Sequence, residues 1–387
     1  MSRFHAYIRN AALLLQGYEG SCPLASFLKN YFSQHKKFGS KDRREISTLC
    51  YQFFRLGRLT DKLSVEEGLL AADYIFRGNA SEIIKNLRPD WYSLGSIPLE
   101  QRVEVAGLHL GFAAHTPWFQ LVQPEIPPPD FVKSHFLQPD LFVRVRPGKM
   151  KKVCGMLEKA GVGFCISEGD GLRLPNGTGL EPILKINRDI VVQDWGSQKC
   201  GAIIKFQLPH SGGLLLDACA ASGGKSIMMH DLYSGQFRIA ASDIRPTILQ
   251  NLRKRYAEAG VPADQIFVAD LTKPLANKGF LVDVALVDAP CTGSGTWART
   301  PEQHYYFNPE SLQAFTDRQF LICKNVLDKI KTGGYLIYIT CSVFNAENHG
   351  VINRLASTFS LKAIHEEIIN GTLLKADSMY IAILQKI

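Results

Sequence analysis

The stretch from Asp283 to Glu302 reads DVALVDAPCTGSGTWARTPE and decides the fold of the chain. Residues 284–287 form an apolar run that is typical of a central parallel strand covered on both faces. Pro290 has no backbone N–H and glycines follow it, so we expect the strand to end at Asp288 and to enter a turn. Asp288 and Cys291 are therefore expected at the carboxyl end of the strand, where open α/β sheets bind their ligands.

Length and composition indicate an ordinary globular protein. The chain has 387 residues, of which 46% are hydrophobic and 21% charged, enough for two or three domains with their own cores. The N-terminal sequence MSRFHAYIRN lacks the apolar core of a signal peptide, and no apolar run reaches membrane-helix length, so the sequence predicts a cytoplasmic protein with no membrane partner. The nine cysteines form no C-x-x-C pair, so we expect reduced thiols, no disulfide framework and no metal site.

Positive charge is concentrated near the N-terminus. The chain has a formal net charge of +8, and residues 1–62 carry 11 Lys and Arg against 4 Asp and Glu. This basic, aromatic-rich segment is suited to a nucleic-acid phosphate backbone. A solvated helical face explains the same charge, and on charge alone it is slightly favoured.

Residues 1–123 are predicted to be helical, because apolar residues recur at steps of three and four. One such series is Ile46, Leu49, Cys50 and Phe53. Ser40 is the expected N-cap of the helix that carries this series. The following segment 124–130, PEIPPPD, is expected to lack regular structure and to act as a linker.

The remainder of the chain has an α/β pattern. Residues 131–188 predict a small α/β domain with a strand at FVRVRP, a helix at KMKKVCGMLEKAG and two further strands. From residue 189 to residue 387, strands and helices alternate, which predicts a doubly wound, Rossmann-like parallel sheet. One long helix is expected from Pro309 to Lys331, and the tail MYIAILQKI is expected to add an antiparallel strand at one end of the sheet.

The first strand of this sheet runs into DACAASGGKS, residues 217–226. Its small residues allow a ligand to approach the backbone at a helix N-terminus. Three kinds of ligand compete for such a loop. A P-loop requires glycine at position 219, which is Cys219, and the dinucleotide pattern G-x-G-x-x-G is absent. A nucleoside-type cofactor without a pyrophosphate remains.

Acidic residues close four successive predicted strands: Asp217, Asp243, Asp270 and Asp288. Four clustered carboxylates are unfavourable unless other groups bond them. A cationic sulfonium cofactor with ribose hydroxyls and an adenine amine would satisfy them, whereas a phosphate would be repelled. The sequence therefore favours S-adenosyl-L-methionine.

A second thiol, Cys341, ends another buried strand in YITCS. Carbon 5 of a pyrimidine becomes nucleophilic only after a thiolate adds at carbon 6, and a carboxyl group and a second thiol can assist the later steps. Cys341, Cys291 and Asp288 match this inventory. Enzymes acting on carbon 5 of DNA cytosine use the Pro-Cys loop and would not need Cys341, and amino methyltransferases prefer Asn-Pro-Pro-aromatic, so both are disfavoured.

The motifs DACAASGGKS, DAPCTGSGTWARTPE and YITCSVFNAEN together resemble the Sun-type (Nop/Sun, RsmB-like) family of RNA cytosine-5 methyltransferases. The resemblance covers about residues 135–387. More weakly, FGSKDRREISTLCYQFFRLGR resembles the NusB-like helical domain that precedes catalysis in the RsmB branch. Together, these two resemblances imply a NusB-like RNA-binding domain at 1–123, an RNA-contacting α/β domain at 131–188 and a methyltransferase domain at 189–387.

The resemblance also implies roles for individual residues. Cys341 would be the nucleophile, Cys291 would help to release product, Asp288 would contact cytosine and cofactor, and Lys225 would lie near the cytosine. The residues implied to hold the cofactor are Cys219, Ala220, Ala221, Ser222, Gly223, Gly224, Lys225, Asp243, Asp270 and Asp288.

The chain departs from the family pattern at three positions. Ser222 replaces a proline, Ala298 replaces the first of two arginines, and His349 replaces an acid after Glu347. Trp297, just after the reactive loop, is suited either to a core or to a contact with RNA.

The sequence therefore predicts S-adenosylmethionine-dependent methylation of carbon 5 of a cytosine in RNA, with rRNA favoured over tRNA and a monomer favoured. The alternative is a noncatalytic RNA-binding ribosome assembly factor that retains a cofactor pocket. Retention of both Cys291 and Cys341 argues against it, because a scaffold needs neither thiol.

Overall fold

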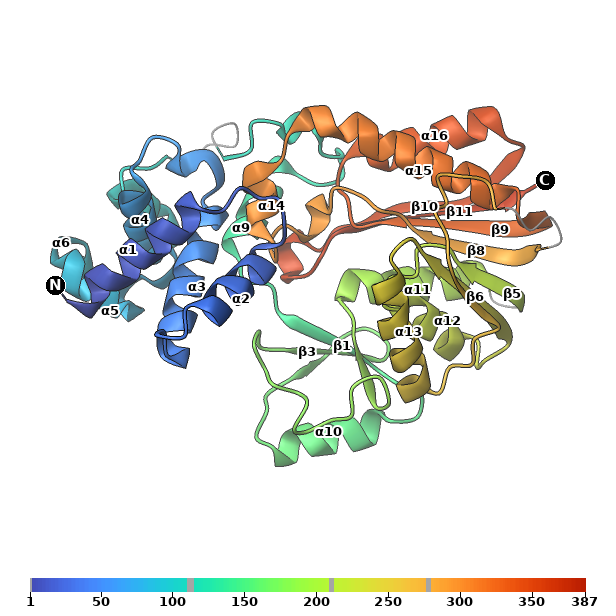
Figure 1. The fold of residues 1–387 in the computed structure, drawn as a ribbon, viewed down its shortest axis with the longest axis horizontal. Helices are drawn as coiled ribbons and strands as arrows, with labels where there is room; N and C mark the ends of the chain where they lie inside the picture. The colour runs from blue at the N-terminus through green and yellow to red at the C-terminus, as the bar shows by residue number, and fades with distance from the viewer. Residues whose placement is uncertain (1, 110–114, 209–211, 276–279) are drawn as a thin grey trace. The chain divides into compact units, whose positions relative to one another are not determined.

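The computed structural model describes residues 2–109, 115–208, 212–275 and 280–387 (Figure 1). Residues 110–114, which fall in the predicted helical region, therefore lie outside the described residues. The chain divides into two compact units. The first unit consists of Met1–Val122, Pro127–Gln138 and Trp297–Pro309. The second unit consists of Gln123–Ile126, Pro139–Thr296 and Glu310–Ile387.

The first unit is helical, as the sequence predicts. Its α-helices are α1 (Arg3–Gln16), α2 (Leu24–Gln34), α3 (Ser40–Arg55), α4 (Val65–Arg77), α5 (Glu82–Leu87), α6 (Pro89–Tyr92), α7 (Leu99–Val105), α9 (Pro128–Phe136) and α14 (Pro301–Tyr306). In α3 the predicted series from Ile46 to Phe53 is buried. The N-cap of α3 is Gly39 and not Ser40, because the side chain of Asp42 accepts a hydrogen bond from the Gly39 N–H.

One segment of this unit differs from the predictions. The proline-rich segment 124–130 is not wholly irregular, because α9 begins inside it at Pro128. Proline suits the first turn of a helix, where its missing N–H has no partner to lose. Of the two alternatives for Trp297, the structure supports the core, because the side chain is only 1% exposed and its ring centroid lies 5.0 Å from that of Trp118.

In the second unit, a small antiparallel sheet has the order β2-β3-β1-β4. Its strands are β1 (Leu141–Val145), β2 (Cys165–Ile166), β3 (Gly171–Leu174) and β4 (Ile190–Val192). The helix α10 (Met150–Lys159) shares its core through Val153 and Leu157. The strand–helix–strand–strand prediction is confirmed, and Cys165 on β2 is exposed.

The larger sheet of the second unit has seven strands in the order β10-β11-β9-β8-β5-β6-β7. The strands are β5 (Gly213–Asp217), β6 (Phe237–Asp243), β7 (Gln265–Val268), β8 (Val282–Asp288), β9 (Ile330–Thr340), β10 (Leu361–Ile369) and β11 (Met379–Lys386). The five strands from β7 to β9 pair in parallel, and β11 and β10 are antiparallel. The predicted α/β class with a Rossmann-like sheet is confirmed.

Helices supply a hydrophobic core on each face of this sheet. They are α11 (Trp195–Gln207), α12 (Gly224–Leu232), α13 (Pro246–Ala259), α15 (Leu312–Leu327) and α16 (His349–Thr358). Successive strand residues alternate between the two cores: Leu286 packs in the core with α11, α12 and α13, and Val287 packs in the core with α15 and α16. This alternation explains the continuous apolar run of β8, because both faces are covered.

Two details at the carboxyl-terminal end of the chain differ from expectation. Helix α15 ends at Leu327, before the predicted Lys331, because Ile330 already pairs with Val282 of β8. Strand β10 was not predicted, since it is an edge strand whose residues are mostly exposed or half-buried, and such strands lack a clear apolar period. As a result β11 is antiparallel, as predicted, but lies one strand inside the edge. None of the described helices is long and apolar enough to cross a membrane.

Asp217, at the end of β5, joins the centre of the sheet to α12. Its side chain is fully buried, and Ser226 of α12 donates a hydrogen bond to Oδ2. Its Oδ1 atom has no hydrogen-bond partner among the described residues. Burial raises the pKa of Asp217 to about 7, although the bond from Ser226 acts in the opposite direction. The carboxyl group is therefore largely protonated in the folded protein below neutral pH.

This pKa predicts a pH effect on stability that Asp217→Asn should remove. The folded protein keeps the Asp217 proton up to about pH 7, whereas the unfolded chain releases it near about pH 4. The contribution of Asp217 to the free energy of unfolding should therefore fall as pH rises from about 4 to about 7. Urea unfolding of the wild type and of Asp217→Asn across this pH range measures the contribution of Asp217 to the free energy of unfolding. A constant difference between wild type and Asp217→Asn would contradict the assignment.

Candidate active site

Parallel pairing brings the predicted thiols and carboxylates to one edge of the large sheet. Strands β5, β8 and β9 are neighbours, so their last residues lie at the same carboxyl edge. Cys291 follows β8 and Cys341 follows β9. Their Sγ atoms are 3.4 Å apart, although 50 residues separate them in the sequence.

The loop from Cys219 to Gly224 connects β5 to α12 and keeps its backbone open to a ligand. Gly223 has a left-handed backbone with φ of 81°, and a Cβ atom there would lie 2.6 Å from the Tyr256 ring. Glycine is therefore required at this position. Ser222, which stands where the family has proline, accepts a hydrogen bond of 2.6 Å from Arg255 Nη1 to its Oγ, so this departure fixes the loop in another way.

Asp243, at the end of β6, is a charged acceptor beside this loop. Its Oδ2 accepts a hydrogen bond of 3.0 Å from the Ala221 N–H, and Arg245 donates to both carboxylate oxygens. Burial acts to raise the pKa of Asp243, but the hydrogen bonds from Arg245 and Ala221 lower it below its ordinary value. The ionised carboxylate is the form that accepts hydrogen bonds from ribose hydroxyls.

Asp270 lies two residues beyond β7. Its carboxylate accepts hydrogen bonds from the Thr272 N–H and the Thr272 hydroxyl, which lower its pKa, and Lys273 Nζ lies 3.4 Å away. Among the described residues, its hydrogen-bond and ion-pair partners are these local ones and not other predicted site residues. The contact of Asp270 with the cofactor therefore stays a prediction.

Lys225 and Asp288 form an ion pair with a distance of 2.6 Å between Nζ and Oδ2. The Lys225 side chain is 11% exposed. Burial alone would lower the pKa of Lys225, but the charge of Asp288 and its hydrogen bond raise it above the ordinary value. The lysine is therefore held as a cation next to the carboxylate that ends β8.

The two thiols are not equivalent. The hydrogen bond with Cys341 raises the pKa of Cys291 well above its ordinary value, and burial raises it further. The proton is therefore held on Cys291. Either sulfur can be the donor of the hydrogen bond between them, and both residues are half-buried.

Glu347 positions both thiol loops, and the sequence analysis did not assign it a role. The side chain is fully buried. It accepts hydrogen bonds from the Thr292 N–H and hydroxyl on the loop after β8, from the Ser342 hydroxyl on the loop after β9, and from Gln319 of α15. The sequence signal was present, because Glu347 lies in the quoted motif YITCSVFNAEN.

The next residue, Asn348, reinforces this arrangement. Its Oδ1 accepts a hydrogen bond of 2.6 Å from the Thr340 hydroxyl, and its Nδ2 donates to the Ser342 carbonyl. His349 contacts the carboxylate of Glu366. The acid expected after Glu347-Asn348 in the family is thus replaced by a basic side chain that pairs with a nearby glutamate.

The loop and carboxylates fit S-adenosyl-L-methionine. Gly224 has no described atom within 4 Å of the position of a Cβ, Asp243 gives an ionised acceptor, and Asp288 gives a carboxylate on the same edge. No phosphate-binding residue is required for such a cofactor. The cofactor expected from the sequence, S-adenosyl-L-methionine, therefore agrees with the side chains at this edge of the sheet.

Comparison with known proteins supports the same family. The family model described as 16S rRNA methyltransferase RsmB/F matches residues 206–379. The probable ribosomal RNA small subunit methyltransferase B of Synechocystis sp. is 34% identical over 164 residues, which cover 42% of this chain and 36% of that protein. Its Bacillus subtilis counterpart is 27% identical over 228 residues, or 57% of this chain and 50% of that protein. The chain therefore matches half or less of the length of these relatives.

Solved structures share the fold. The crystal structure of PH0851 has a TM-score of 0.70 and 20% identity, with 99% of this chain and 98% of that chain covered. The structure of NSun6 from Pyrococcus horikoshii, solved with SFG, an analogue of S-adenosylmethionine, has a TM-score of 0.59 and 16% identity, with 70% and 96% covered. Motifs, fold and family model agree: residues 206–379 match the RsmB/F family of methyltransferases.

Proposed function

We propose that the protein methylates carbon 5 of a cytosine in rRNA, with S-adenosyl-L-methionine as methyl donor. The RsmB/F family match and the names of the curated relatives support an rRNA methyltransferase. The observation that carries the finer proposal is the approach of Cys341 Sγ to 3.4 Å from Cys291 Sγ, on the same sheet edge as the pair of Lys225 and Asp288. Two thiols and a carboxylate are what this reaction requires.

The reaction begins at Cys341. Its thiolate attacks carbon 6 of the cytosine, so an S–C6 bond forms and the electron pair of the C5–C6 double bond becomes available at carbon 5. Bound S-adenosylmethionine supplies the methyl group that carbon 5 then accepts. The proton of the Cys341 thiol passes to Asp288, which would then donate a hydrogen bond to N3 of the ring and favour this electron movement. The target base must be unpaired or flipped out, because stacking blocks attack on the ring face.

Release requires the second thiol. Loss of the proton from carbon 5 restores the C5–C6 double bond and expels Cys341 as a thiolate. Cys291 is protonated while Cys341 is free, because the hydrogen bond with Cys341 raises its pKa. Once Cys341 is bonded to carbon, this hydrogen bond is lost and the proton of Cys291 passes to solvent. The Cys291 thiolate can then take the proton from carbon 5 and complete the elimination.

The first test is methyl transfer to total RNA from a strain that lacks the gene. Labelled S-adenosylmethionine is incubated with wild type or with Cys341→Ala, offering both free RNA and ribosomal particles. We expect label in 5-methylcytosine with the wild type and none with Cys341→Ala, because the nucleophile is lost. Cofactor binding without any methyl transfer by the wild type would instead support the noncatalytic assembly factor.

The release role of Cys291 predicts a trapped intermediate. In Cys291→Ala, Cys341 can still attack and methylation can proceed, but elimination slows, so a covalent protein–RNA adduct should accumulate on a denaturing gel. The double variant Cys291→Ala, Cys341→Ala should form none. The isolated buried thiol Cys323 offers a matched control, since Cys323→Ala removes a thiol without forming an adduct. Equal adduct levels in wild type and Cys291→Ala would overturn the assigned role.

Glu347 is predicted to act by positioning the thiols. In Glu347→Gln one of the two acceptor oxygens is replaced by an amide, so the hydroxyls of Thr292 and Ser342 lose their common acceptor. We expect single-turnover methyl transfer to slow by about 10- to 100-fold, because small displacements of reacting groups have such effects. Affinity for S-adenosylmethionine should be unchanged. The control is Glu367→Gln, which makes the same change on the edge strand β10, where Glu367 contacts His365. A loss of cofactor affinity in Glu347→Gln equal to its loss of rate would contradict a positioning role.

A further inference from the structure

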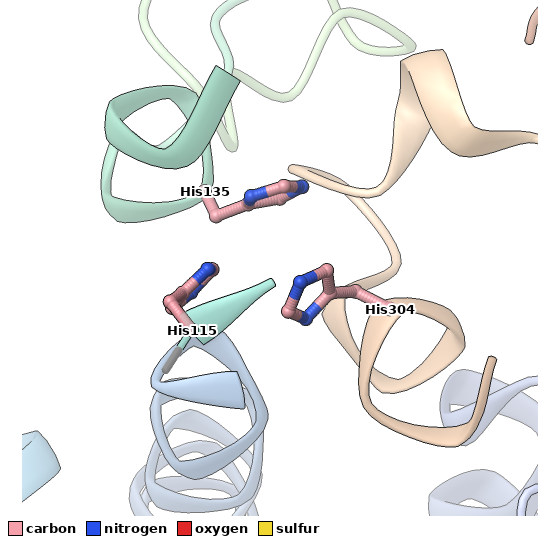
Figure 2. Close-up of side chains that lie close together, drawn as sticks. All are labelled: His115, His135 and His304. Carbon is pink, nitrogen blue, oxygen red and sulfur yellow. The ribbon is translucent and has the colours of Figure 1, made fainter. Parts of the chain in front are cut away.

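Three buried histidines from separate segments of the chain meet inside the helical unit. His115 lies next to Thr116, His135 lies on α9, and His304 lies on α14. One side-chain nitrogen from each lies within 4.8 Å of the other two, and all three residues are buried. Figure 2 shows the three imidazole rings gathered around a common space. All three belong to the first unit, so the cluster is separate from the proposed methyl-transfer site.

We propose that His115, His135 and His304 bind a divalent transition-metal ion, with Zn²⁺ as the best-suited ion. Neutral imidazole is the usual nitrogen ligand for zinc, and three protein ligands with one further position is an established coordination pattern for this ion. Two nitrogens on one tetrahedral zinc lie about 3.3 Å apart, so the widest pair must close by about 1.5 Å at most. Small rotations of the rings provide this movement.

Thr116 sets the orientation of two of the rings. Its Oγ1 atom lies 2.9 Å from His115 Nδ1 and 3.2 Å from His304 Nε2. An oxygen with two lone pairs can accept an N–H from each ring. The remaining nitrogens, His115 Nε2 and His304 Nδ1, then carry the lone pairs that a metal requires. A hydrogen bond to the second ring nitrogen is the usual support of a metal-bound histidine.

Gly57 packs directly against these two rings. A Cβ atom at this residue would lie 2.6 Å from His304 Cε1, 3.1 Å from His304 Nδ1 and 3.2 Å from His115 Nε2, so a larger residue would collide with them. Its φ of 54° is also in the region that favours glycine. The carbonyl oxygen of Arg55 lies 3.2 Å from His115 Nε2, so this carbonyl or a water could complete the coordination.

His135 supplies the third nitrogen. Its Nδ1 atom is buried and has no hydrogen-bond partner among the described residues. An unpaired buried nitrogen is unfavourable, and a bound cation would satisfy it. Burial lowers the pKa of His115 to about 4 and lowers the pKa values of His135 and His304 well below the ordinary value.

Charges of both signs surround the cluster. The positive charges of Arg55 and Arg58 act on His135 and His304, and the Arg55 guanidinium donates hydrogen bonds to the backbone carbonyls of His135 and Leu137 and to the side chain of Gln138. Glu302 precedes His304 by two residues on α14, is buried, and has an Oε2 atom with no hydrogen-bond partner among the described residues. Its carboxyl group offers negative charge within the same unit.

The competing explanation is a hydrogen-bonded stack without a metal. In that arrangement His304 donates to Thr116, Thr116 donates to His115, and His115 donates to the Arg55 carbonyl. This series of hydrogen bonds gives partners to His115 and His304 but leaves His135 Nδ1 without one among the described residues. Metal binding accounts for all three rings.

The decisive measurement is made on the untagged full-length wild-type protein. After dialysis against a chelator, Zn²⁺ or Co²⁺ alone is titrated, and bound metal is counted by mass spectrometry. We expect one equivalent, a visible Co²⁺ spectrum of a low-coordinate site, and X-ray absorption with three nitrogen ligands at about 2.0 Å. Zn²⁺ should also raise the unfolding temperature. A wild type that binds neither ion in stoichiometric amount overturns the proposal, whatever the variants do.

Variants then assign the ligands. His304→Gln and His135→Gln should lose more than about 100-fold in affinity, and Thr116→Val, which keeps the ligands but removes the supporting oxygen, should lose about 10- to 100-fold. The control His35→Gln changes a histidine of the same unit whose Nδ1 contacts the Tyr31 carbonyl, and it should bind metal as the wild type does. Circular dichroism verifies folding. Equal metal affinity in wild type and folded His304→Gln would overturn the assignment.

Discussion

Parallel pairing of β5, β8 and β9 is the constraint on which the proposed site depends. Adjacent parallel strands end at the same edge, so whatever follows each strand is brought together regardless of sequence distance. The register places Asp217 beside Leu286 and Asp288 beside Ile339. The loop after β8 and the loop after β9 therefore start side by side, and each carries one thiol. No local feature of either loop could create the 3.4 Å separation of Cys291 and Cys341.

The acidic edge of this sheet is stable because each carboxyl group is either protonated or paired with its own neighbouring residue. Asp217 is buried with a raised pKa, Asp243 pairs with Arg245, Asp270 bonds Thr272, and Asp288 pairs with Lys225. Judged from the sequence alone, the four carboxylates would need a cationic cofactor to relieve their mutual repulsion. The protein provides much of that relief itself, so the chemical fit of the cofactor rests on the shape of the glycine loop and on the ionised acceptor Asp243.

A buried carboxylate holds the two thiol loops in register. Glu347 accepts hydrogen bonds from residues on both loops and from α15, and Asn348 adds bonds to the end of β9. Burying an ionisable group in this way is favourable only when its hydrogen-bonding capacity is filled. The same principle applies in the helical unit, where Thr116 serves two histidine rings and His135 Nδ1 is left without a partner among the described residues.

The sequence alone determined the class of fold, the strands that carry the motifs, and the position of two thiols and several carboxylates at strand ends. These features follow from the spacing of apolar residues and from the glycines and prolines that end each strand, which are local properties. The sequence missed β10, whose polar edge residues carry no clear period, and misjudged segment 124–130, where α9 begins at Pro128. Tertiary structure alone decided the hydrogen-bond partners of Glu347, the burial of Trp297 and the meeting of His115, His135 and His304. Such contacts join residues far apart in the chain, and no spacing rule connects positions whose proximity exists only after the surrounding helices and strands have packed.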